Sequence, residues 1–269
     1  MRTRSEWDPN RYVDVSNQQM QWALETLQNA ALRGNEDILD VGCGDGKITA
    51  SIAEITTGRV LGIDRSRTMI AYAKQTHECS DKPNLQFDIG EAETYRPQMN
   101  VHIIVSFTAL HWVSDHQTLL GHFNDILADA GKLVLQFPGQ GNAEPLIEVA
   151  FEIMNDSQWK PYFTDFRFPW SFFAVDQYTE WLKQAGFRPH DVKLLGKAMA
   201  HQGTQGLAAW MKATWLPFTE RVPSSEHEAF LSAITDRYCR QFAPDKTGTV
   251  YTQMYRLQVI ADKDRSDIP

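Results

Sequence analysis

The first half of the chain alternates short apolar runs with stretches in which apolar residues recur at helical spacing. Apolar positions over 17–32 follow a helical period, and Gly34 then supplies a stop signal. Beyond it we expect, in chain order, strand 38–41, helix 48–55, strand 60–64, helix 68–75, strands 85–87 and 101–107, helix 118–127 and strand 132–137. Strands that alternate with single helices form βαβ units, whose right-handed crossovers put helices on both faces of a parallel sheet. The pattern predicts an α/β, doubly wound (Rossmann-like) fold.

In the second half of the chain, strands and helices no longer alternate regularly. A loop rich in proline and glycine over 138–142 leads into a segment at 146–172 that we expect to be aromatic-rich and irregular. Helix 178–185, strand 192–199, a largely helical stretch over 207–242 and a strand over 249–260 follow, which completes a mostly parallel seven-stranded sheet. No repeat and no linker divides the chain, so we expect a single domain over 1–269. Its core would span about 33–138, 173–200 and 247–262, with helical cap insertions from 1–32, 139–172 and 201–246.

Composition narrows the class of protein. The 269 residues are 42% hydrophobic and 22% charged, as in ordinary globular proteins, and the formal net charge of -8 argues against a nucleic-acid partner. No apolar run is long enough for a membrane helix, and the first residues lack the apolar run of a signal peptide. Three cysteines without CxxC spacing favour neither a disulfide framework nor a zinc site. We expect a cytoplasmic protein without a membrane partner or a bound metal, either a monomer or a homodimer.

A glycine-rich loop follows the first expected strand. Glycines at 42, 44 and 46 allow a tight turn and a close approach of the backbone to a ligand. A dinucleotide fingerprint would need a glycine where Lys47 stands, and no Walker A pattern is present. Asp64 ends the next strand about 20 residues downstream, where a carboxylate can accept hydrogen bonds from both hydroxyls of a ribose. An alternative role for Asp64 is to cap the following helix, which Ser66 could do as well.

With Asp40 before it, this loop resembles the first motif of class I S-adenosylmethionine-dependent methyltransferases. The resemblance implies that S-adenosylmethionine is the cofactor and S-adenosylhomocysteine the product, with Asp40 facing the methionine end. Glu91 would hold the adenine amine, with Asp88 as a competing candidate, and Met69 would lie near the adenosine or simply in the core. The cofactor residues implied in this way are Tyr12, Asp40, Gly42, Cys43, Gly44, Gly46, Asp64, Arg65, Met69, Glu91, Ala92 and Ser106. Two departures from the family pattern, His102 in the fourth strand and 130–132 before the fifth, touch none of them.

The loop after the fourth expected strand carries His111 and Trp112. Ligands of doubly wound sheets bind at the carboxyl ends of the strands, so this loop should face the methyl donor, and an aromatic ring attracts a sulfonium cation. His111 and His116 are spaced wrongly for two metal ligands on one helix face. A purely structural role for His111 is the alternative.

Residues spread over the chain resemble a narrower branch of the family. Residues 7–12 are similar to trans-aconitate methyltransferases; Tyr12 with Gln19, 110–113 and 215–223 are similar to juvenile hormone acid methyltransferases; malonyl-carrier-protein methyltransferases share the plan. All three methylate carboxylates. The resemblance implies that Tyr12 and Gln19 lie on a lid helix and that Gln19, His111 and Trp112 approach the substrate carboxylate.

The chemistry of a carboxylate acceptor is simple, because the acid is ionised at neutral pH and needs no general base. Neutral donors or an arginine would recognise it, and Arg167 and Arg221 are candidates unless they are solvated surface residues. Aromatic residues of the insertions would line an apolar chamber or form the core of the cap. We therefore expect an O-methyltransferase of a small-molecule or carrier-linked carboxylic acid. The alternatives are a methyltransferase for a hydroxyl, nitrogen or carbon acceptor, a protein or RNA methyltransferase, and a non-catalytic cofactor-binding regulator.

Overall fold

The computed structural model describes residues 17–78 and 82–264 and divides the chain into two compact units. The sheet unit contains the described residues up to Gln140, Trp170–Leu195 and the chain from Arg256 onward. The helical unit contains Gly141–Pro169 and Gly196–Tyr255. Each unit is described by itself below.

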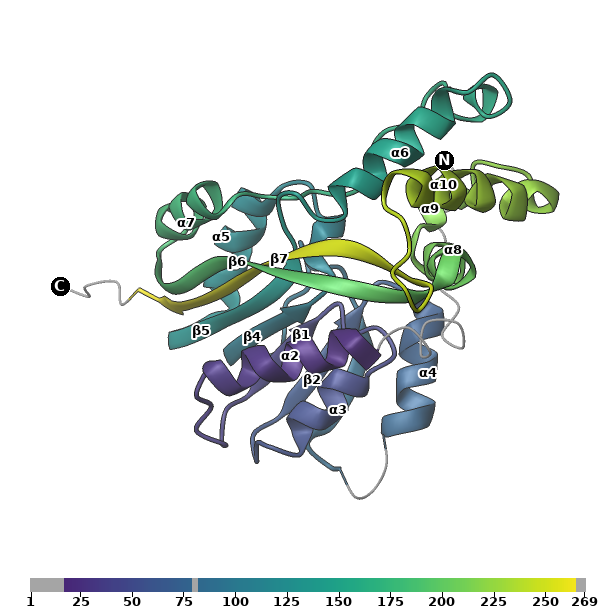
Figure 1. Cartoon of the computed structure of the whole chain (residues 1–269). Helices are drawn as coiled ribbons and strands as arrows, with labels where there is room; N and C mark the ends of the chain where they lie inside the picture. The colour runs from purple at the N-terminus through teal and green to yellow at the C-terminus, as the bar shows by residue number, and fades with distance from the viewer. Residues whose placement is uncertain (1–16, 79–81, 265–269) are drawn as a thin grey trace. The chain divides into compact units, whose positions relative to one another are not determined.

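Seven strands form one sheet in the order β3-β2-β1-β4-β5-β7-β6, which confirms the predicted mostly parallel seven-stranded sheet (Figure 1). Neighbouring strands from β3 to β5 pair in parallel, whereas β7 runs antiparallel to β5. The strands are β1 (Ile38–Val41), β2 (Val60–Asp64), β3 (Leu85–Ile89), β4 (Val101–Phe107), β5 (Leu127–Pro138), β6 (Phe187–Gln202) and β7 (Thr249–Lys263). Both β6 and β7 cross the boundary between the two units.

Helices cover both faces of the sheet, as a doubly wound fold requires (Figure 1). One face buries α2 (Asn17–Asn29), α3 (Lys47–Ala53) and α4 (Arg67–His77). The other buries α5 (His116–Ile126) and α7 (Val175–Gln184). Side chains of successive strand residues point to opposite faces, so Leu133 and Leu135 pack with the second group of helices and Val134 packs with the first.

The helical unit contains α6 (Glu144–Asn155), α8 (Gly203–Thr214), α9 (Leu216–Thr219) and α10 (His227–Gln241), and α10 packs against α6 and α8. The short 3-10 helices η2 (Lys160–Tyr162) and η3 (Ser224–Glu226) also belong to it. The prediction of an irregular segment from residue 146 is wrong for its first part, which is helix α6. Pro145 in the first turn fixes a helical φ, and the buried face repeats at helical spacing: Leu146, Ile147, Val149, Ala150, Ile153 and Met154.

The compact units differ from the expected division into core and cap in several places, among them residues 196–200, which we expected in the core and which lie in the helical unit. Helix α2, which we expected in the cap, packs against the sheet through Ala23, Leu27 and Ala30. The start of β7, which we expected in the core, lies in the helical unit. Among the described residues, no helix is long and apolar enough to cross a membrane.

Candidate functional site

The glycine loop between β1 and α3 is a tight turn whose backbone conformation favours glycine. Gly42, Gly44 and Gly46 have φ values of 76°, 54° and 80°, in the left-handed region that favours glycine. A Cβ atom on Gly42 would lie 2.1 Å from the Cβ of Ala109, so the loop also passes directly against the segment after β4. The N–H groups of Gly42 and Cys43 both donate to the carbonyl of Ile63, at 2.8 and 2.9 Å, and hold the loop beside the end of β2.

Asp64 lies at that end of β2 and faces the loop. Its carboxylate accepts hydrogen bonds from the N–H groups of Gly44, at 3.1 Å, and Ser66, at 2.8 Å. Ser66 is the N-cap of α4, because its hydroxyl accepts the N–H of Met69 at 3.3 Å. The capping role that was the alternative for Asp64 therefore belongs to Ser66. A carboxylate offers about four lone-pair sites, so Asp64 can still accept bonds from a ligand.

Three carboxylates gather at the loop. Asp40 is buried, accepts the Thr49 hydroxyl at 2.6 Å, and has its pKa raised to about 7 by burial and by the negative charges of Asp64 and Asp45. Burial also raises the pKa of Asp64. A positively charged ligand would relieve this repulsion. This set of carboxylate acceptors thus fits a cofactor that carries a sulfonium and an ammonium group beside a ribose.

The turn after β3 adjoins the same corner, because the Gly90 N–H donates to the Asp64 carbonyl at 3.1 Å. Glu91 is exposed there, and Ala92 is half-buried. Both carboxylate oxygens of Asp88 are engaged, one by the Ile89 N–H at 2.8 Å and the other by the Tyr95 hydroxyl at 3.0 Å. A carboxylate with two such bonds can still accept others, so Glu91 and Asp88 both stay predicted candidates for the adenine ligand.

The remaining cofactor candidates have varied surroundings. Met69 is buried in α4, and burial raises the pKa of the Cys43 thiol, which therefore keeps its proton. Ser106 is fully buried and donates to the Val41 carbonyl at 2.7 Å, which ties β4 to the start of the glycine loop. Arg65 is exposed and reaches toward the loop after β4, with its guanidinium carbon 6.0 Å from the ring centroid of Trp112. Their contacts with the cofactor stay predictions.

His111 and Trp112 lie in η1 (Leu110–Trp112), directly after β4, with their ring centroids 5.1 Å apart. The His111 side chain is buried, and no group in the described part of the chain makes a hydrogen bond to its Nδ1. Burial, followed by the positive charge of Arg256, lowers the pKa of His111 to about 3, so the imidazole is neutral. The indole of Trp170 lies beside them, with its ring centroid 5.9 Å from that of Trp112.

Arg256 is the residue that sequence reasoning missed. It lies on β7, is 2% exposed, and donates from Nη2 to the Thr108 hydroxyl at 2.6 Å. Its guanidinium carbon lies 4.8 Å from the ring centroid of Trp22 of α2. A signal was present in the sequence, since Arg256 is the charged residue on a face of the last strand that, over 250–260, otherwise carries Val250, Thr252, Met254, Gln258 and Ile260. The expected arginines differ: Arg167 is exposed, and Arg221 pairs with Asp165 within the helical unit.

The aromatic residues of the insertions pack largely against one another. Trp159 and Phe163 contact Phe230, and Phe166 contacts Phe218, all within the helical unit. These contacts support the core alternative for the insertions. Tyr12 lies outside the described residues. Gln19 falls in the first turn of α2, but its side chain is outside the described part.

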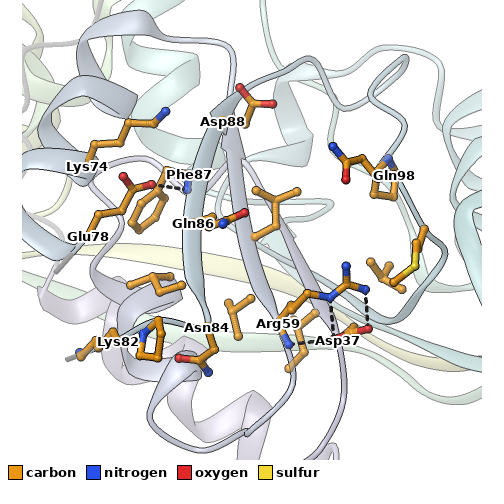
Figure 2. A pocket seen from close by; sticks show the side chains of 18 of the residues that line it. Asp37, Arg59, Lys74, Glu78, Lys82, Asn84, Gln86, Phe87, Asp88 and Gln98 are labelled. Atoms are coloured by element: carbon orange, nitrogen blue, oxygen red, sulfur yellow. Dashed lines mark hydrogen bonds and ion pairs between the residues drawn. The ribbon is translucent and has the colours of Figure 1, made fainter. Parts of the chain in front are cut away.

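A groove of about 760 Å³ runs along β3, one of the two edge strands of the sheet (Figure 2). It is lined by charges of both signs, including Lys74, Glu78 and Asp88, and contains none of the predicted site residues apart from Asp88 as the alternative to Glu91. Glu78 turns its carboxylate to the strand and accepts the Phe87 N–H at 2.8 Å (Figure 2). Among the described residues no group of three or more His, Cys, Asp or Glu could hold a metal ion.

The chain is similar in sequence to known methyltransferases. A family model described as a methyltransferase domain matches residues 32–186. The chain is 27% identical over 261 residues to a trans-aconitate 2-methyltransferase of Escherichia coli, a match that covers 96% of this chain and 98% of the relative. It is 26% identical to a putative methyltransferase of Invertebrate iridescent virus 6, over 88% of this chain and 86% of the relative.

Solved structures agree on the fold. A putative methyltransferase from Bacillus halodurans has a TM-score of 0.63 at 17% identity and covers 90% of this chain and 98% of its own. An N-methyltransferase of Haemonchus contortus was solved with phosphomonomethylethanolamine and S-adenosylhomocysteine. It has a TM-score of 0.56 at 17% identity, and the match covers 91% of this chain and 53% of the neighbour's chain. The matched family model spans more than half of the chain, so the expected membership is confirmed. The chain belongs to the methyltransferase domain family, and it is an enzyme that takes its methyl group from S-adenosylmethionine.

Proposed function

We propose that the enzyme transfers the methyl group to the carboxylate of a small-molecule or carrier-linked acid. The observation that carries this proposal is the state of His111. Burial lowers the pKa of this histidine to about 3, so the imidazole is neutral and poorly suited to take a proton from an alcohol or a carbon acid at neutral pH. A carboxylate is already ionised and needs no such base.

Two further observations support the same acceptor. The trans-aconitate 2-methyltransferase of Escherichia coli is named for an acid, and it aligns with 96% of this chain. Neutral hydrogen-bond donors gather beside the end of β4, where doubly wound folds bind their ligands. These are the His111 imidazole and the indoles of Trp112 and Trp170.

The cofactor roles follow from the chemistry of the loop. Asp40, with the nearby charges of Asp45 and Asp64, would favour the cationic methionine end, and Asp64 would accept the ribose hydroxyls. Glu91 and Ala92 would hold the adenine, while Tyr12 and Gln19 would cover the site. When bound, S-adenosylmethionine supplies a methyl group on a positively charged sulfur, and its transfer to a carboxylate oxygen yields an ester without any proton transfer.

The residues of this chain would act chiefly by positioning. The indole of Trp112 already lies within cation–π distance of Arg65, so its face can attract positive charge. His111 and Trp112 would orient the acceptor oxygen, and water would be excluded by the indoles around them. Alignment of reactants in this way can supply about 7–11 kcal/mol of a barrier.

The experiment that tests this function compares acids with their matched alcohols. Labelled methyl transfer to trans-aconitate, crotonate and fumarate is measured beside transfer to crotyl alcohol. We expect base-labile methyl esters from at least one acid and no ether from the alcohol. Methylation of the alcohol alone would refute the proposal.

A further inference from the structure

A buried cation lies beside the proposed acceptor site. Arg256 faces the Pro138 end of β5 in the antiparallel register, so it lies at the carboxyl edge of the parallel strands. Its Nη2 donates to the Thr108 hydroxyl at 2.6 Å, and the Trp22 ring lies against its guanidinium at 4.8 Å. These two contacts fix the position of the charge. Ligands of this class of fold bind at the same edge of the sheet.

The segment that carries Thr108 is held in an unusual conformation. Thr108 has a φ of 59°, in the left-handed region that a β-branched residue rarely adopts, and its N–H donates to the Gln136 carbonyl at 2.8 Å. The turn brings the Thr108 hydroxyl to Arg256 and begins the loop that carries His111. Strained backbone of this kind persists where the surroundings hold it in place, often at ligand sites.

His111 supplies the second, independent observation. Its side chain is more than nine-tenths buried, and its Nδ1 has no hydrogen-bond partner in the described part of the chain. A buried polar atom without a partner costs free energy that a ligand can recover. Arg256 is close enough for its charge to act on the imidazole. The cluster thus combines a fixed positive charge with a neutral group that still has hydrogen-bonding capacity.

The charges of the proposed reaction assign different roles to these two groups. An acceptor carboxylate loses its negative charge as it becomes an ester. A cation bound to that carboxylate would stabilise the starting state more than the transition state and would slow the reaction. The neutral His111 carries no such penalty. A fixed guanidinium is suited instead to an anion whose charge does not change during transfer.

We propose that Arg256 and Thr108 bind a second, non-reacting carboxylate of the acceptor, so that the substrate is an acid with at least two carboxylates. This assignment builds on the proposed carboxylate transfer and adds the residues that select the acid. Arg256 is then a specificity-determining residue, and the methyl group goes to the carboxylate beside His111 and Trp112.

Binding, rather than turnover, gives the first test. Calorimetry in the presence of S-adenosylhomocysteine compares fumarate with crotonate, which has a methyl group in place of one carboxylate. We expect wild-type protein to bind fumarate about 10- to 100-fold more tightly than crotonate. Arg256→Gln should abolish this preference and leave crotonate within about 2-fold. Arg256→Lys should keep part of it, because a point charge replaces a planar, two-pronged donor.

Two variants make the comparison specific. Thr108→Val keeps the shape of the side chain and Arg256 itself, and should weaken fumarate binding by about 3- to 10-fold. Arg59→Gln removes an exposed arginine that pairs with Asp37 and should bind both acids as the wild type does. If Arg256→Gln does not fold, Arg256→Lys and Thr108→Val still decide the question through the ratio of the two affinities.

The outcomes separate this inference from the proposed function. A wild-type protein without a fumarate preference, or variants that weaken both acids equally, would overturn the role of Arg256. Methyl esters formed by the wild type, together with a preference that survives Arg256→Gln, would keep the function and reject the second-carboxylate site. If the preference for fumarate depends on Arg256 but the enzyme methylates no acid, the second-carboxylate site is kept and the proposed function is rejected.

Discussion

The raised pKa of Asp40 should make the stability of the ligand-free protein depend on pH in an unusual direction. Carboxylates in proteins more often have lowered pKa values and stabilise the folded state as pH rises. Asp40 is 2% exposed, and its pKa rises from 3.8 to about 7 because of burial and of the charges of Asp64 and Asp45. Between these values the folded protein holds a proton that the unfolded chain has released. Stability is therefore lost as pH rises through this window.

The size of the effect follows from the shift. One pKa unit corresponds to about 1.4 kcal/mol, so the full shift of Asp40 corresponds to about 4 kcal/mol, of which about 2–3 kcal/mol is lost between about pH 5 and pH 7.5. Asp40→Asn keeps the shape and an oxygen that can accept the Thr49 hydroxyl, but it cannot ionise. Urea unfolding of both proteins at the two pH values, at constant salt, isolates the contribution of Asp40. Between about pH 5 and pH 7.5, the free energy of unfolding of the variant should fall by about 2–3 kcal/mol less than that of the wild type.

Cofactor binding gives a second readout of the same residue. A cation stabilises ionised Asp40, so the affinity of the wild type for S-adenosylmethionine should increase as pH rises toward 8, and Asp40→Asn should show a weaker increase. Equal pH dependence of unfolding in the two proteins would refute the assignment of the raised pKa to Asp40. An unchanged pH dependence of binding would place the cofactor's positive charges elsewhere.

Three other substitutions test the site. Asp64→Ala removes a carboxylate proposed to accept two ribose hydroxyls and should raise the Kd for S-adenosylmethionine, measured by calorimetry, at least about 100-fold. As a control, Asp125→Asn changes an exposed carboxylate of α5 and should leave the Kd unchanged. Unchanged affinity of Asp64→Ala would reject the ribose role. Trp112→Ala should lower kcat for the methylated acid by roughly 10-fold or more with cofactor affinity within about 3-fold, and the opposite split would move Trp112 away from the reacting atoms. Gly42→Ala puts a methyl group 2.1 Å from Ala109 at a positive φ and should cost about 2–5 kcal/mol in urea unfolding, whereas Gly121→Ala, on α5 with open space around it, should be neutral or stabilising; a Gly42 variant as stable as the wild type would contradict the tight turn.

Local spacing in the sequence predicted the parts of the site that are close along the chain. Asp64 lies 20 residues from Gly44, and the βαβ connection between them has a fixed geometry, so their hydrogen bond could be anticipated. The strands of the sheet were predictable for the same reason, because a buried parallel strand is a short apolar run. The S-adenosylmethionine cofactor followed from these local features and the resemblance that they carry.

Contacts between distant segments could not be predicted in this way. Arg256 meets Thr108 across 148 residues, and the meeting depends on the register of β7 against β5. Helix α2 belongs to the sheet because its apolar face finds a partner there, which its own amphipathic pattern does not identify. The low pKa of His111 results from burial by several segments and from Arg256. Each of these features requires tertiary packing and is absent from any single stretch of sequence.

The edge strand β3 has a consequence for how the protein behaves at high concentration. The N–H groups of Leu85, Phe87 and Ile89 already donate to the Lys82 carbonyl, the Glu78 carboxylate and the Asp88 carboxylate. A strand from another chain that added at this edge would have to break these bonds first. The hydrogen bonds that Glu78 and Asp88 accept therefore oppose edge-to-edge association of sheets from different molecules. Glu78→Ala would free the Phe87 N–H to pair with an added strand.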